Sequence, residues 1–101
     1  MTGGSPERPS VKTVRVRIEG RVQGVWFRGW TKDQADRRGL SGWVRNRQDG
    51  SVEALFSGPA RVVADMMEAC WAGPPAARVS KVTPVPDAPP QDRGFRTLPT
   101  R

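Results

Sequence analysis

The first segment that could do chemistry is a glycine-rich stretch with an arginine at its end. It reads GRVQGVWFR and covers residues 20–28. Gly20 and Gly24 can adopt positive φ and let a ligand approach the backbone. If this loop leads into a helix, several N–H groups and the positive end of the helix dipole point to one place. Arg28 adds a planar guanidinium that fits two oxygens of a phosphate. The segment indicates an oxyanion site, although many such loops are only turns.

The second segment reads GWVRNRQDGSVEALFSG and covers residues 42–58. It contains Asn46 at the end of an expected strand, just before the hairpin signal Asp49-Gly50. A carboxamide both donates and accepts hydrogen bonds, so it can position a water molecule without adding charge. Taken alone, an asparagine beside a hairpin more often only favours the turn.

Charge and composition narrow the function classes. The net charge is +7, and all of this excess lies in residues 12–47, which favours anionic partners, although arginines can also simply solvate a surface. The chain has no histidine and one cysteine, which excludes Cys-His nucleophiles, histidine acid–base catalysis and an internal disulfide. We expect no metal and no cofactor. The chain lacks an apolar run of about 20 residues and a secretory signal, so we expect a cytoplasmic protein without membrane contact.

The order of expected elements predicts the fold. Alternation of apolar and polar residues over 11–19 indicates a strand, and residues 20–25 a loop. Helical spacing over 26–38 ends at a glycine suited to the turn after a helix. Further expected elements are strands at 41–47 and 51–57, a helix after Pro59, and strands at 79–85 and 95–98. The buried stripe of the second helix is expected to comprise Val62, Val63, Met66, Ala69, Cys70 and Trp71.

The resulting β-α-β-β-α-β order predicts an α+β fold of the ferredoxin-like, split β-α-β type. We expect an antiparallel sheet with two helices on one face and a short extra strand. The length allows one domain, placed at residues 12–98, and residues 1–11 are expected to form a disordered tail.

The two segments together resemble the motifs of the acylphosphatase family, in the same order and at a matching spacing. The resemblance covers roughly residues 12–98 and implies metal-free hydrolysis of the carboxyl–phosphate bond of acyl phosphates. It assigns phosphate binding and catalysis to Arg28 and the orientation of water to Asn46. It also implies that the substrate phosphate is held by the backbone amides of Gly20, Arg21, Val22, Gln23, Gly24 and Val25. Family members are usually monomers that act on a small molecule, so we expect no nucleic-acid partner.

Two further expectations concern residues around the loop. Trp26 adjoins the loop and could be exposed beside the site. Arg15, Arg17, Arg45 and Arg47 lie on strands near the loop and could steer anions in general.

Three other functions fit the same pattern. RNA-recognition domains share this layout, but they stack bases on strand aromatics, and the expected solvent-side positions here are Arg, Thr, Ser and Glu. A domain that handles carbamoyl phosphate within a larger maturation factor would carry the same motifs. A non-catalytic regulatory domain of this fold would need neither Arg28 nor Asn46.

Overall fold

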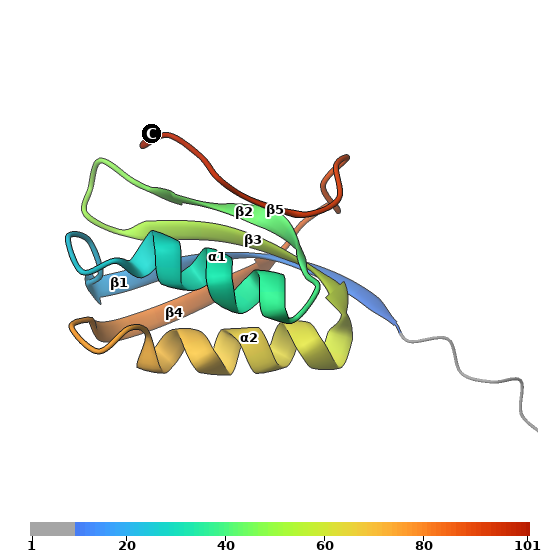
Figure 1. The fold of residues 1–101 in the computed structure, drawn as a ribbon, viewed down its shortest axis with the longest axis horizontal. Helices are drawn as coiled ribbons and strands as arrows, with labels where there is room; N and C mark the ends of the chain where they lie inside the picture. Colours follow the sequence, from blue (N-terminus) through green and yellow to red (C-terminus); the bar gives the residue numbers. More distant parts are fainter. Residues whose placement is uncertain (1–9) are drawn as a thin grey trace, which may run out of the picture.

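A computed structural model describes residues 10–101, which form one sheet and two helices (Figure 1). The elements in chain order are β1 (Val11–Arg21), α1 (Phe27–Arg37), β2 (Ser41–Asn46), β3 (Val52–Pro59), α2 (Ala60–Ala72), β4 (Arg78–Pro86) and β5 (Phe95–Thr97). This order confirms the predicted β-α-β-β-α-β arrangement with a short extra strand. None of the helices in residues 10–101 has the length and apolar character needed to cross a membrane.

The strands lie in the order β4-β1-β3-β2-β5. The strands β4, β1, β3 and β2 pair with one another antiparallel, as predicted. The short β5 instead pairs parallel with β2, so the complete sheet is mixed. β1 is an interior strand that pairs with β3 on one side and β4 on the other. Because the chain passes from the end of β1 through residues 22–26 into α1, this pairing fixes where the β1–α1 loop begins.

The core lies between the sheet and the two helices, which cover the same face (Figure 1). The apolar residues of β1 oppose those of β3 in register, with Val14 facing Phe56 and Ile18 facing Val52. The buried helix residues are Phe27, Thr31 and Ala35 in α1 and Val63, Met66 and Cys70 in α2. The predicted buried stripe of α2 is thereby confirmed in outline, but the prediction that Trp71 is buried is wrong, because 51% of its surface is exposed.

The end of β1 differs from the prediction. The strand continues through Gly20 and Arg21, which pair with β4 after a register shift at Glu19/Gly20. Gly20 has φ +124°, and a Cβ there would lie 2.2 Å from the carbonyl oxygen of Arg78. The close approach that requires this glycine is therefore made by β4, and the loop itself begins at Val22.

Within the described residues, the folded domain extends beyond the predicted bounds of residues 12–98 at both ends. Residues 1–9 of the expected disordered tail lie outside the described residues. Val11 pairs with Pro59, and the carbonyl oxygen of Ser10 accepts a hydrogen bond of 2.8 Å from the Ala60 N–H. At the other end, the Arg101 N–H donates to the carbonyl oxygen of Asn46 at 3.1 Å, so the last residues run along β2.

Cys70→Ser should lower the free energy of unfolding by about 1 kcal/mol, because it places a hydroxyl in an apolar core. Cys70 is fully buried, and burial raises the pKa of its thiol to about 12 despite the opposing charge of Arg38. The native thiol should therefore not react with a thiol reagent at pH 8, where the unfolded chain does. Denaturant unfolding and thiol titration measure both effects. Rapid labelling of the native protein would show that Cys70 is not buried between α2 and the sheet.

Candidate functional site

The loop between β1 and α1, residues 22–26, is anchored in the core and open on its outer side. Val22 is 1% exposed and belongs to the core. Gly24 has φ +73°, and a Cβ there would meet no atom within 4 Å. Trp26 has φ +67°, the one positive φ at a residue other than glycine in the described chain, a conformation that costs about 1–2 kcal/mol. The loop therefore keeps a strained shape with its outer side free.

The backbone N–H groups of residues 22–29 find no acceptor in the described part of the chain. The first hydrogen bond of α1 is donated by the Trp30 N–H to the Trp26 carbonyl oxygen, at 3.0 Å. No side chain caps α1, and no acidic residue lies in its first turn. At the start of α2, by contrast, the Ala60 N–H donates to Ser10. The positive end of the α1 dipole is thus left for an external anion.

Arg28 lies in the first turn of α1, as predicted, and is half-buried. Within residues 10–101 its guanidinium makes no ion pair and no side-chain hydrogen bond. The other half-buried cations all have a carboxylate partner; they are Lys32, Arg38, Arg45 and Arg47. A partly desolvated, uncompensated positive charge is costly unless an anion approaches it.

Asn46 is the last residue of β2, opposite Val52 of β3. It follows Gly42 and Val44 in the two-residue period of the strand, and these two residues are buried under the helices. Its carboxamide forms no hydrogen bond with the described protein. The start of α1 and the β2–β3 hairpin lie at the same end of the molecule (Figure 1). The structure therefore brings Arg28 and Asn46 to one end and one face of the sheet.

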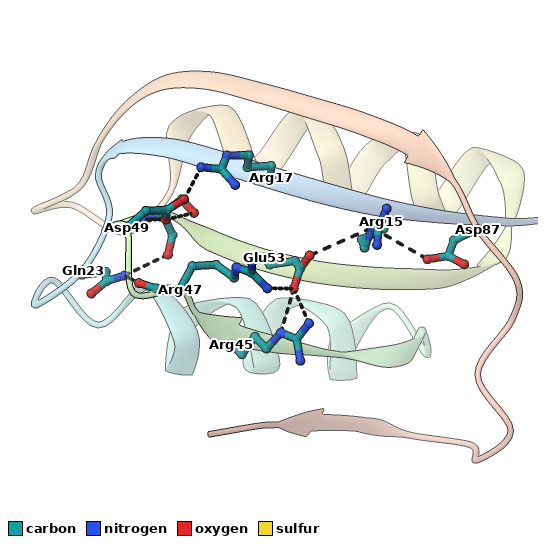
Figure 2. A network of polar contacts seen from close by, with 9 residues as sticks. Arg15, Arg17, Gln23, Arg45, Arg47, Asp49, Glu53 and Asp87 are labelled. Carbon is teal, nitrogen blue, oxygen red and sulfur yellow. Dashed lines mark hydrogen bonds and ion pairs between the residues drawn. The ribbon is translucent and has the colours of Figure 1, made fainter. Parts of the chain in front are cut away.

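Gln23 has a contact that the sequence analysis missed. Its side-chain Nε2 donates to the carbonyl oxygens of Arg47 and Ser51, at 2.8 Å each (Figure 2). These residues face each other across the mouth of the hairpin, where the Arg47 N–H donates to the Ser51 carbonyl at 2.8 Å. The family resemblance implied a role only for the backbone amide of Gln23. No local sequence pattern predicts side-chain partners more than twenty positions away.

The hairpin turn is fixed from within and from β1. One oxygen of Asp49 accepts hydrogen bonds from the backbone N–H and the hydroxyl of Ser51, at 3.0 and 2.6 Å, and the other pairs with Arg17. The hydrogen bonds from Ser51 lower the pKa of Asp49 most, and the contact with Arg17 lowers it further. Together they hold this pKa far below its ordinary value. The charged form of Asp49 therefore persists over the physiological pH range and keeps the turn in place.

The arginines expected to steer anions are instead paired on the face away from the helices (Figure 2). Glu53 accepts from Arg45 at 2.6 Å, and it also pairs with Arg47 and Arg15 at 3.4 and 4.0 Å. Arg17 pairs with Asp49. Because carboxylates compensate these charges, general steering by the four arginines is not supported. Within residues 10–101, the positive charges at this end that have no carboxylate partner are Arg28, the α1 terminus, and the exposed Arg21 and Arg78, which end β1 and begin β4.

Trp26 is 63% exposed, in agreement with its expected place at the surface beside the loop. Its indole rests on Gly29, where a Cβ would lie 2.1 Å from Nε1. Among residues 10–101, no three His, Cys, Asp or Glu side chains gather closely enough to ligate a metal ion.

Comparisons with known proteins agree with this geometry. A model of the acylphosphatase family matches residues 14–97. An acylphosphatase of Rhodospirillum rubrum is 54% identical over 90 residues, which cover 89% of this chain and 99% of that protein. The solved structure of an acylphosphatase from Coxiella burnetii superposes with a TM-score of 0.83 at 33% identity, over 87% of this chain and 93% of that one.

A HypF structure shares the fold at 19% identity, with a TM-score of 0.84 over 95% of this chain but only 13% of HypF. This likeness concerns the fold alone. The family match, by contrast, spans both segments singled out in the sequence, the loop that leads to Arg28 and the hairpin that carries Asn46. The chain belongs to the acylphosphatase family.

Proposed function

We propose that the protein is an acylphosphatase, which hydrolyses the carboxyl–phosphate bond of an acyl phosphate to a carboxylate and inorganic phosphate without a metal ion. The observation that carries this proposal is the unpaired, half-buried Arg28 beside the N–H groups of residues 22–29, which lack acceptors in the described chain. The membership in the acylphosphatase family supports the same reaction.

The phosphoryl group binds at the loop. Its non-bridging oxygens accept hydrogen bonds from the N–H groups of residues 22–25 and from the guanidinium of Arg28. Gly20 and Arg21 contribute indirectly, because their pairing with β4 fixes where the loop begins. Since these donors are in place before the substrate arrives, they stabilise the charge of the transition state without reorganising.

Asn46 positions the attacking water. Its side chain is uncommitted within the described protein and lies at the same end and on the same face as Arg28. Water attacks phosphorus opposite the acyl oxygen, the P–O bond to the carboxylate breaks, and the carboxylate departs with the electron pair. A phosphoryl oxygen takes the proton of the water. Because a carboxylate is a weak base, its departure needs little help from a general acid, and positioning with electrostatics supplies the catalysis.

The proposal includes a cytoplasmic monomer that binds neither nucleic acid nor a membrane. An RNA-recognition sheet needs a bare aromatic side chain for base stacking. Trp43, the aromatic residue of β2, is half-buried, with the guanidinium of Arg45 4.6 Å from its ring centroid. This occupied face favours the small-molecule enzyme over the nucleic-acid module.

Release of phosphate from benzoyl phosphate tests the function. Hydrolysis should proceed in excess EDTA, because the proposed site uses only amides, Arg28 and Asn46. Inorganic phosphate and sulfate should inhibit competitively, and more weakly as ionic strength rises, because both occupy the same charged site. Loss of activity on chelation that a divalent ion restores would contradict the metal-free mechanism, and purely non-competitive inhibition would place the anion elsewhere.

Arg28→Ala should weaken phosphate inhibition and lower kcat together, because the guanidinium contacts the phosphoryl group before and during the reaction. Arg28→Lys should not restore activity, since a point charge lacks the planar pair of donors. Arg37→Ala, at an exposed arginine of the same helix, is the matched control and should match the wild type. An Arg28→Lys variant with wild-type kcat and KM would show that charge alone suffices.

Asn46→Ala should lower kcat by about 100-fold or more while the inhibition constant of phosphate stays nearly unchanged, because water placement matters mainly in the transition state. Steady-state kinetics measure both constants, and circular dichroism checks the fold. If this variant binds phosphate far more weakly at unchanged kcat, then Asn46 belongs to the anion site.

A further inference from the structure

Gln23 makes the only described side-chain hydrogen bonds that run directly from the loop of residues 22–26 to the β2–β3 hairpin. Both partners, the carbonyl oxygens of Arg47 and Ser51, can only accept hydrogen bonds. The NH₂ end of the amide must therefore face them, which fixes the orientation of the side chain. The half-buried carboxamide spans the last rung of the hairpin.

The two halves of the proposed site come from elements that are not neighbours in the sheet. The loop continues β1, whereas Asn46 ends β2, and β3 lies between these strands. Gln23 links the loop directly to the end of β2, because one of its acceptors is the carbonyl of Arg47, the residue directly after Asn46. A hydrogen bond at that carbonyl restrains the peptide that follows Arg47, one residue beyond the Asn46 side chain.

We propose that Gln23 is a positioning residue, whose side chain sets the distance between the bound phosphoryl group and the water held by Asn46. This inference rests on the proposed function. It adds a role for the Gln23 carboxamide that is separate from phosphate binding by the backbone N–H group of the same residue.

The expected kinetic signature follows from this division of roles. The loop amides and Arg28 bind phosphate by themselves, so removal of the Gln23 donors should leave phosphate affinity within about threefold of the wild type. In-line attack depends on the placement of the water to within about 1 Å, and a misplacement of that size costs on the order of 100-fold. Gln23→Leu should therefore lower kcat at least tenfold at every pH tested.

Gln23→Glu supplies a readout that a merely structural role does not predict. A neutral carboxyl group can donate one hydrogen bond to either carbonyl, whereas a carboxylate cannot donate and is repelled by both. Among the charged groups around this position, Arg17 is paired with Asp49 and Arg47 with Glu53. Arg21 and Arg28 have no carboxylate partner within residues 10–101 and favour the charged form of an introduced carboxyl group. The kcat of Gln23→Glu, relative to the wild type, should consequently rise as the pH falls from 8 to 5.

The matched control is Gln91→Glu. It makes the same chemical change at an exposed residue of the segment before β5, which approaches the start of β2, far from Asn46. Its pH profile should follow the wild type. Measurements use benzoyl phosphate as substrate and inorganic phosphate as inhibitor, with circular dichroism as the check of folding.

The outcomes separate the two proposals. If the wild type hydrolyses benzoyl phosphate but Gln23→Leu keeps its kcat, or loses phosphate affinity in proportion to kcat, the positioning role is wrong and the proposed function stands. Parallel pH profiles of Gln23→Glu and the wild type would overturn the role as well. If the wild type is inactive, the proposed function fails. The positioning role of Gln23 is then tested by NMR. Inorganic phosphate should perturb the Asn46 side-chain amide in the wild type and not in Gln23→Leu, and equal perturbation in both proteins would overturn this role.

Discussion

The site depends on a run of backbone N–H groups, residues 22–29, for which the described protein provides no acceptor. Peptide N–H groups are strong donors, and leaving several without partners at a helix start concentrates positive potential there. The fold holds them in this arrangement through Val22, which is buried in the core, and through the left-handed backbone of Trp26. Arg28 adds a charge of the same sign. In the proposed function, the oxygens of a phosphoryl group accept from the N–H groups of residues 22–25 and from Arg28.

The surroundings of this positive centre are arranged to keep carboxylates away from it. Glu53 and Asp49 are engaged by arginines on the side of the sheet that the helices do not cover. The exposed ion pair of Arg17 with Asp49 contributes little to stability, typically less than about 1 kcal/mol, whereas the ion pair of Arg45 with Glu53 is largely buried. Their value here is geometric, because they fix the hairpin that carries Asn46 and leave Arg28 uncompensated.

The sequence predicted the elements wherever a local rule decides the structure. Alternation fixed the inward residues of β1, Asp49-Gly50 marked the hairpin, and helical spacing placed Arg28 in the first turn of α1. The roles of Arg28 and Asn46 came from the family resemblance, and the structure adds that both side chains are uncommitted in the described protein. Local rules failed where distant segments decide the structure. Gly20 allows close contact with β4, and Trp71 is exposed although it directly follows the buried Cys70. Likewise, the partners of Gln23 lie on another hairpin.

The central claim is that the free N–H groups at the start of α1 form the anion site. A titration of the ¹⁵N-labelled protein with inorganic phosphate, followed by amide chemical shifts, tests this claim most directly. The account predicts saturable shifts concentrated at residues 22–29. Shifts centred instead on the arginines of the sheet face, such as Arg15 and Arg45, with the loop unchanged, would contradict it.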